Sequence, residues 1–170
     1  MMGVAGAGKT TVGRLLAADL GGRFVDGDDL HTDSARAKMG SGVALTDDDR
    51  WPWLDRIGAA LADGLAAGRS TIVACSALRR AYRGRLRAAV GPALQFVYLV
   101  ATPEAMRKRV GERAGHYMPA SLVDSQFAML EPPTDEPDVI ELPADSELNP
   151  AIPRLATQLR ANIATKGKPS

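Results

Sequence analysis

The chain has 170 residues, enough for one domain with a hydrophobic core, and its 45% hydrophobic and 24% charged residues are ordinary for such a domain. A formal net charge of +1 gives no field that favours nucleic acid, and no apolar run is long enough to span a membrane. A single cysteine excludes an internal disulfide, and the charged residues near the start exclude a signal peptide, so we expect a cytoplasmic protein.

The first predicted element is a phosphate-binding loop. Residues 3–10, Gly-Val-Ala-Gly-Ala-Gly-Lys-Thr, match the pattern G-x-x-x-x-G-K-[ST] at every fixed position. Glycines let backbone N–H groups turn toward an anion, Lys9 reaches the β- and γ-phosphates, and the Thr10 hydroxyl binds Mg²⁺. A helix predicted over 11–20 directs its positive end at the same point. The alternative is a glycine-rich turn that only begins a helix.

The strand that should precede this loop is short. A phosphate loop normally follows a buried strand, but only Met1 and Met2 precede Gly3. The strand is therefore either stunted or starts upstream of Met1, and we favour the second hypothesis. Apolar codons in frame upstream would support it, and a stop codon there would exclude it.

Apolar runs alternate with helical patterns along the rest of the chain. The strand-like runs cover 24–25, 71–75, 94–100 and 139–140. Helical patterns lie between them, and the middle helix begins either at a capping box of Thr46 and Asp49 or at Pro52. The alternation predicts a three-layer α/β/α fold with a parallel sheet, in one domain over 1–170. Ligands bind beyond the carboxyl ends of such strands.

Two carboxylates follow the second predicted strand. If the chain is still extended there, Asp26 and Asp28 lie on one side, so that one could hold a magnesium-bound water while the other takes a proton from a hydroxyl. The alternative is an acidic turn at Asp-Gly. His31 either hydrogen-bonds a polyhydroxylated substrate or caps the helix that runs to Met39. His31 and His116 lack metal-ligand spacing with cysteine, so zinc is not supported.

Basic residues follow two further elements. Arg50, in an acid-rich helix start, is a candidate to clamp a substrate carboxylate. Arg79, Arg80 and Arg83 follow the third strand, where they suit an anionic substrate unless they form a solvated helix face. Cys75 is interpreted as a buried strand residue and not as a nucleophile.

A basic segment predicts a lid over the site. Arg109 and Arg113 precede Gly115 and Pro119, and glycine and proline around arginines suit a mobile lid. An arginine delivered by closure stabilises the charge that spreads over the transferring phosphate, and closure excludes water.

Together these motifs resemble the gluconokinases, a family of P-loop kinases. The similar segments are G-V-A-G-A-G-K-T at 3–10, F-V-D-G-D-D-L-H at 24–31, K-M-G-S-G-V-A-L-T-D-D-D-R-W-P-W-L at 38–54, C-S-A-L-R-R-A-Y-R at 75–83, G-H-Y-M at 115–118 and Q-F-A-M-L-E at 126–131. The resemblance implies ATP- and Mg²⁺-dependent phosphorylation of the 6-hydroxyl of D-gluconate. It also implies a five-stranded parallel core, a lid at about 111–133 and commonly a homodimer.

The resemblance assigns a role to each candidate residue. It implies that Asp28 binds and deprotonates the acceptor hydroxyl, and that Asp26 and Thr10 hold the metal, Asp26 through water. Lys9, Arg109 and Arg113 would act on the transferring phosphate. The residues implied to bind ATP are Gly3, Val4, Ala5, Gly6, Ala7, Gly8, Lys9, Thr10 and Thr11, and those implied to bind the acceptor with Asp28 are His31, Arg50, Arg79 and His116.

Two alternatives stay open from the residues. A sibling kinase would act on shikimate, another sugar acid or a nucleotide, although Cys75-Ser76-Ala77 stands where a shikimate-type enzyme is expected to carry a Gly-Gly pair, and aromatic residues are only 5%. A non-catalytic nucleotide sensor is the other alternative, and it would not need the paired aspartates.

Overall fold

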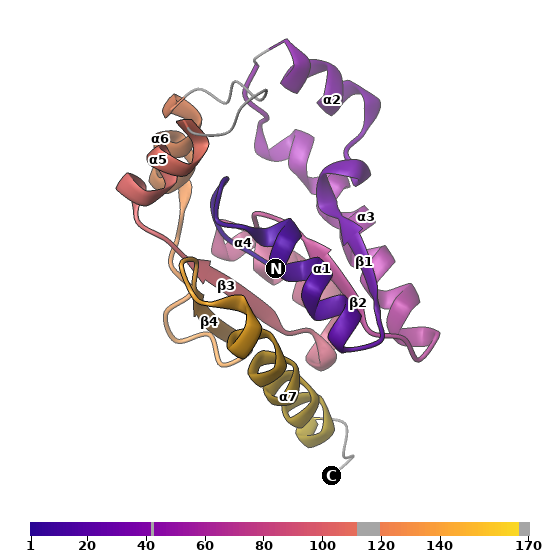
Figure 1. Cartoon of the computed structure of the whole chain (residues 1–170). Helices are drawn as coiled ribbons and strands as arrows, with labels where there is room; N and C mark the ends of the chain where they lie inside the picture. Colours follow the sequence, from indigo (N-terminus) through magenta and orange to yellow (C-terminus); the bar gives the residue numbers. More distant parts are fainter. Residues whose placement is uncertain (42, 112–119, 167–170) are drawn as a thin grey trace.

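The computed structural model describes residues 1–41, 43–111 and 120–166. Parallel strands form its centre and helices cover both faces (Figure 1), which confirms the predicted α/β fold. Among the described residues, no helix is both long enough and apolar enough to cross a bilayer.

The strands form two parallel pairs with the N-terminus between them. In the first pair β1 (Arg23–Asp26) lies beside β2 (Thr71–Ala74), and in the second β3 (Phe96–Val100) lies beside β4 (Val139–Pro143). Residues 1–3 join the pairs, because Cys75 N–H donates to the Met1 carbonyl at 2.9 Å and Met2 N–H to the Val97 carbonyl at 2.8 Å. Among the described residues, the five-stranded parallel core that the resemblance implies is therefore four strands in two pairs, with only an isolated bridge of Met2 with Tyr98 between the pairs.

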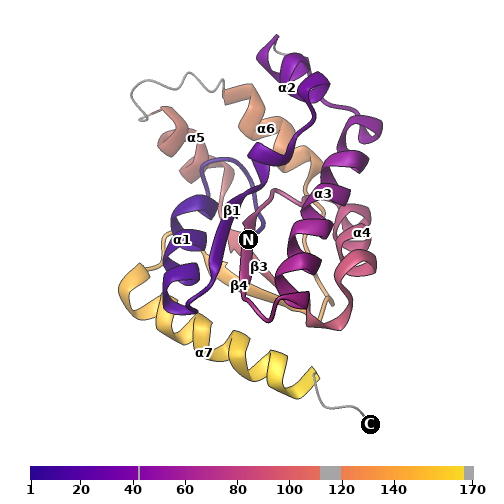
Figure 2. The same cartoon turned by 90° about the vertical axis from the view of Figure 1, so that its right-hand side faces the viewer.

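The helices form a layer on each face of the sheet and a group at one end. The layer of α1 (Lys9–Asp19) and α7 (Leu148–Lys166) covers one face, and that of α3 (Asp47–Ala66) and α4 (Arg80–Val90) covers the other (Figure 2). Three further helices gather beyond the carboxyl ends of the strands: α2 (Asp33–Gly40), α5 (Pro103–Gly111) and α6 (Ala120–Met129). Short 3₁₀ turns η1 (Gly27–Leu30) and η2 (Gly91–Ala93) follow β1 and α4.

The ambiguous start of α3 is resolved in favour of its capping box. The Thr46 hydroxyl accepts from Asp49 N–H at 3.3 Å, and the Asp49 carboxylate accepts from Thr46 N–H at 2.9 Å. Pro52 lies inside the helix, so the alternative interpretation, in which the helix starts at this residue, is wrong. Reciprocal capping satisfies two free donors at once and so fixes the earlier start.

Other boundaries differ modestly from expectation. Helix α1 begins at Lys9 instead of residue 11, and β3 begins at Phe96 because Leu94 still belongs to the turn that follows η2. Strand β4 extends to Pro143, well beyond the weak run at 139–140. Thr32, and not His31, caps α2, since its hydroxyl accepts from Ala35 N–H at 3.1 Å, so the capping interpretation of His31 is wrong.

Candidate active site

The phosphate loop is folded as its sequence requires. Gly8 has a φ of 97°, a left-handed conformation that suits glycine, and it is the residue from which α1 starts. The Lys9 ammonium donates to the carbonyls of Gly3 at 2.9 Å and Val4 at 3.0 Å, so it is held over the loop. An anion in the loop would meet this ammonium together with the N-terminal end of α1.

The end of β1 brings two carboxylates beside the loop. Asp26 Oδ2 accepts from the Thr10 hydroxyl at 3.3 Å, and its Oδ1 accepts from Asp28 N–H at 3.2 Å. A Cβ on Gly27 would lie 2.3 Å from the Ala74 carbonyl, so only glycine lets the chain turn this close to β2. The extended chain assumed for this segment is wrong, because η1 begins at Gly27. The turn nevertheless keeps Asp26 in contact with Thr10 and Asp28 within electrostatic range of Lys9.

Electrostatics prepare Asp28 for proton transfer. Partial exclusion of water raises the pKa of its carboxyl above the usual value, and the negative charge of Asp26 raises it further. His31 and Lys9 act in the opposite direction, which places both residues within electrostatic range. A carboxylate with a raised pKa accepts a proton more readily, as a general base near neutral pH must.

His31 is buried against an indole ring. It is only 4% exposed, and its ring stacks on Trp53 with centroids 4.4 Å apart and an interplanar angle of 10°. Trp53 Nε1 in turn donates to the Gly27 carbonyl at 2.6 Å, which ties the stack to the Asp26–Asp28 turn. Burial lowers the pKa of His31, and its Nδ1 atom is buried without a hydrogen-bond partner among the described residues. Burial therefore favours the neutral form of the imidazole, and one of its nitrogens has no hydrogen-bond partner there.

Arg50 and Arg79, the two arginines proposed to bind the acceptor's carboxylate, both contact the side chain of Asp47. Arg79 donates to Asp47 Oδ2 at 2.7 Å, and Arg50 approaches Asp47 Oδ1 at 3.4 Å. Tyr82 donates to the same Oδ1 at 2.5 Å. Its ring lies beneath both guanidinium groups, with the ring centroid 5.9 Å from Cζ of Arg50 and 5.8 Å from Cζ of Arg79. Helices α3 and α4 thus place two cations side by side, as binding of one organic acid requires.

The remaining basic residues of α4 divide between structure and solvent. Arg83 is 0% exposed and forms a buried ion pair with Glu136, while it donates to the carbonyls of Ala77 and Leu78 at 3.1 Å. Neither proposed role for Arg83 is correct, because it neither faces solvent nor is open to a ligand. Arg80 is exposed, and its backbone N–H donates to Glu131 at 2.6 Å.

Four other residues considered in the sequence analysis have different outcomes. Arg109, on α5, donates to the Ala144 carbonyl at 3.0 Å, just after β4. Arg113 and His116 lie outside the described residues, and so does most of the first half of the expected lid. Burial raises the pKa of Cys75 to about 11, which fits its interpretation as a buried, unreactive thiol.

The donor set near the loop fits magnesium. Thr10 and Asp26 offer a hydroxyl and a carboxylate oxygen in hydrogen-bond contact, and Mg²⁺ prefers such oxygen ligands, usually with waters and phosphates completing its shell. In the part of the chain that the structure describes, no cluster of three or more histidine, cysteine or acidic side chains could hold a metal ion. The metal would therefore be held largely by the nucleotide, with Thr10 and Asp26 as its protein contacts.

Sequence reasoning missed several residues of the site. Asp47 and Tyr82 stood only within motifs, and Asp47 was interpreted only as one of the acidic residues at the start of a helix. Gln126, on α6, accepts from Ala5 N–H of the phosphate loop at 2.6 Å, and Glu131 joins the end of the same segment to α4. Their only signal was the segment 126–131, which carries no chemistry that spacing alone can identify.

The fold and site together define a P-loop kinase. A family profile described as an AAA domain matches residues 1–133. A thermosensitive gluconokinase of Escherichia coli is 38% identical over 164 residues, which cover 96% of this chain and 85% of the relative. A gluconokinase of Gluconobacter oxydans is 40% identical over 161 residues, 95% of this chain and 90% of the relative.

Solved structures agree with these relatives. The crystal structure of a gluconokinase from Sinorhizobium meliloti superposes with a TM-score of 0.84 at 38% identity, covering 98% of this chain and 95% of that one. A shikimate kinase from Aquifex aeolicus reaches a TM-score of 0.52 at 14% identity, a likeness of fold alone. The chain belongs to the gluconokinase family.

Proposed function

We propose that this kinase transfers the γ-phosphate of ATP to the 6-hydroxyl of D-gluconate, giving 6-phosphogluconate. The observation that carries the proposal is the Arg50–Arg79 pair gathered at Asp47, in a chain that also has an intact phosphate loop with Asp28 beside it. Phosphate loops are general, but a paired guanidinium site for an acid selects the acceptor. The gluconokinase relatives, which cover nearly the whole chain, support the same acceptor.

Each residue group has one task in this reaction. The loop from Gly3 to Thr11 and the Lys9 ammonium hold the phosphates and stabilise the charge that develops on the transferring group. Thr10, and Asp26 through a water molecule, would hold Mg²⁺, which would neutralise phosphate charge when bound. Asp28 orients the acceptor hydroxyl and receives its proton.

The acceptor is held at its other end by cations. Arg50 and Arg79 bind the carboxylate of the sugar acid, and neutral His31 hydrogen-bonds one of its hydroxyls. Arg109, Arg113 and His116 complete the proposed site. The lid over about 111–133, the single domain over 1–170, the homodimer and the cytoplasmic location stay predictions of the sequence.

An assay of ADP release tests the acceptor. The protein is supplied with ATP, Mg²⁺ and either gluconate, shikimate or AMP, and we expect ADP release with gluconate only. Equal turnover of shikimate would replace gluconate with the sibling alternative. Silence with every acceptor, together with retained ATP binding, would support the nucleotide sensor.

Substitution of the proposed base tests the mechanism. We expect Asp28→Asn to lower kcat by about 10²-fold or more while ATP binding persists, because general base catalysis typically contributes about 10²–10⁴-fold. Asp29→Asn is the matched control, since Asp29 is the adjacent exposed carboxylate, and it should leave kcat unchanged. An effect of Asp28→Asn confined to the KM for gluconate would make Asp28 a binding residue.

A further inference from the structure

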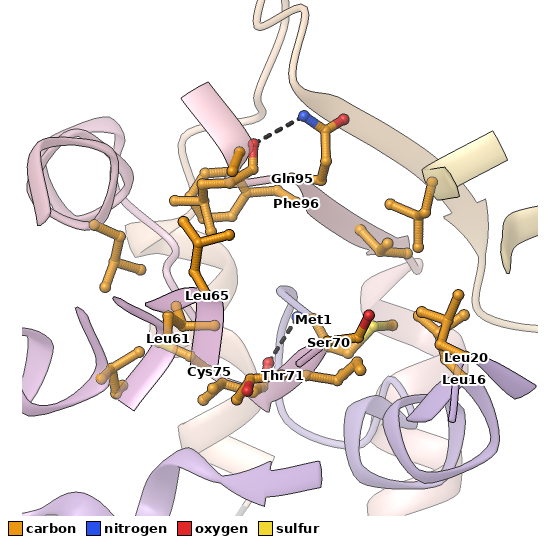
Figure 3. Close-up of a pocket in the computed structure, with 18 of the residues that line it drawn as sticks. Met1, Leu16, Leu20, Leu61, Leu65, Ser70, Thr71, Cys75, Gln95 and Phe96 are labelled. Atoms are coloured by element: carbon orange, nitrogen blue, oxygen red, sulfur yellow. Dashed lines mark hydrogen bonds between the residues drawn. The ribbon is translucent and has the colours of Figure 1, made fainter. Parts of the chain in front are cut away.

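The turn that joins β2 to α4 has a conformation that its own residues do not favour. Ala77, in the middle of this turn, has a φ of 42°, in the left-handed region that residues with a Cβ rarely adopt. Cys75, just before the turn, and Ala77 both line an apolar cavity of about 350 Å³ (Figure 3), so the turn is not closely packed on that side. Contacts from elsewhere in the chain must therefore hold it.

The carbonyl groups of the turn receive such contacts. The Ser76 carbonyl accepts from Gly3 N–H at 3.2 Å, which ties the turn to the phosphate loop. The next two carbonyls, those of Ala77 and Leu78, each accept from Nη1 of buried Arg83 at 3.1 Å. The backbone that leads into α4 is thus fixed as far as residue 78.

Helix α4 begins without a cap of its own. Its N-cap residue is Arg79, whose side chain makes no capping hydrogen bond. Serine, threonine, aspartate and asparagine are preferred at this position because their oxygens accept from the first backbone N–H groups of a helix, whereas an arginine side chain offers only donors. The Arg79 side chain instead reaches Asp47 at 2.7 Å. The residue type that suits the proposed acid site thus leaves the helix without a local cap.

Glu131 supplies the cap from another part of the chain. Its Oε2 atom accepts at 2.6 Å from Arg80 N–H, the first N–H of α4, and its own backbone N–H donates to the Leu78 carbonyl at 2.9 Å. These two bonds hold the backbone immediately before and after Arg79. A carboxylate at this end of the helix also complements the positive pole of its dipole.

We propose that Glu131 is a positioning residue for Arg79, because it caps α4 in place of residue 79 and leaves the Arg79 side chain available for the carboxylate of the acceptor. Since Arg79 binds that carboxylate only in the proposed function, this inference rests on the proposed function. The Glu131 carboxylate is directed at the backbone of Arg80, so it acts through Arg79. Its loss should therefore weaken binding of the acid without slowing phosphate transfer.

Removal of the Glu131 side chain tests this role. We expect Glu131→Ala to raise the KM for gluconate about fivefold and to lower Tm by about 3 °C, as loss of an N-cap does. The kcat and the Kd for ATP in the absence of gluconate should stay near the parent values. Glu104→Ala is the matched control, since the Glu104 side chain is 79% exposed on α5, and it should change none of these quantities. An unchanged KM for gluconate, or an equal loss of affinity for ATP, would overturn the proposal.

A conservative variant separates capping from charge. Glu131→Gln keeps a side-chain oxygen that accepts from Arg80 N–H, but it carries no charge. Its KM for gluconate and its Tm should therefore stay close to those of the parent. If Glu131→Gln is impaired as much as Glu131→Ala, loss of charge and not of the cap explains the effect, and the proposal fails.

A second substitution moves the cap back into the helix. Serine at the N-cap position accepts from the N–H groups of its own helix. Arg79→Ser should therefore change Tm more favourably in the Glu131→Ala background than in the parent, by about 3 °C. The KM for gluconate should not recover, because the guanidinium group is lost. Equal effects on Tm in the two backgrounds would show that Glu131 does not replace a cap, which overturns the proposal.

The same assays keep this inference distinct from the proposed function. If the parent protein releases no ADP with gluconate, the proposed function fails, and the role of Glu131 toward the acceptor fails with it. If the parent phosphorylates gluconate but Glu131→Ala changes kcat alone, the proposed function stands and only the positioning role of Glu131 is refuted.

Discussion

Replacement of Arg83 by methionine should destabilise the fold strongly, although the residue lies in a basic helix. Arg83 is 0% exposed, and its Nε and Nη2 atoms donate to Glu136 at distances between 2.5 and 3.2 Å. Its Nη1 donates to the carbonyls of Ala77 and Leu78. Methionine keeps an unbranched apolar stem but supplies none of these donors.

The expected loss follows from what would remain buried. Glu136 is 8% exposed and would retain only Arg87 as an ion-pair partner. The Ala77 carbonyl would lose its Arg83 donor, and the Leu78 carbonyl would keep only Glu131 N–H. Removal of one member of a buried pair costs about 3–5 kcal/mol, because the other charge stays desolvated. Since the stability of a whole domain is typically about 5–15 kcal/mol, Arg83→Met should lower the free energy of unfolding by a large fraction.

Chemical denaturation followed by circular dichroism measures this loss. The matched control is Arg85→Met, on the same helix, because Arg85 pairs with Asp55 in solvent, with side chains 44% and 55% exposed. Surface pairs of this kind contribute little, so the control should unfold nearly as the parent does. If Arg83→Met loses less than about 1 kcal/mol, or no more than the control, the buried network is not the source of stability that we infer.

Three other results are expected. The pKa of Glu136 is lowered from 4.5 to about 2, chiefly by its hydrogen bond to Arg83. The stability that Glu136 gives to the fold should therefore be complete above pH 4.5 and decline as the pH falls toward 2. Urea midpoints that stay constant over this pH range would contradict this expectation. Lys9→Ala should abolish turnover in the ADP-release assay, and near-normal rates would remove Lys9 from the mechanism. Asp47→Asn should raise the KM for gluconate roughly threefold without changing that for ATP, since Arg50 and Arg79 lose a shared acceptor; an equal change in both KM values would refute the assignment.

Much of the fold could be predicted because it depends on local patterns. The phosphate loop, the capping box at Thr46 and the apolar run before Val100 are each defined within a few residues. The alternation of strands and helices then leads to a parallel sheet. The same locality explains the prediction that Asp26 and Asp28 act beside the loop, although the turn that brings them together is 3₁₀ and not extended.

The missed features depend on contacts between distant segments. No local signal distinguishes buried Arg83 from exposed Arg85, because the difference comes from Glu136, 53 positions further along the chain from Arg83. The alternative that His31 caps the next helix is wrong for the same reason, since the stack of His31 on Trp53 forms only when α3 packs against η1. Pairwise contacts across the fold decide such roles, and a single sequence does not encode them visibly.

Helix α6 has an unusual position between the two halves of the site. Gln126 accepts a hydrogen bond from the backbone N–H of Ala5 in the phosphate loop. Glu131, just beyond the helix, accepts one from the backbone N–H of Arg80, which is next to Arg79. A rigid rod anchored in this way makes a shift at either anchor felt at the other. The segment from Gln126 to Glu131 thus contacts the phosphate loop at one end and the residue next to Arg79 at the other, and we expect binding at one end to affect binding at the other.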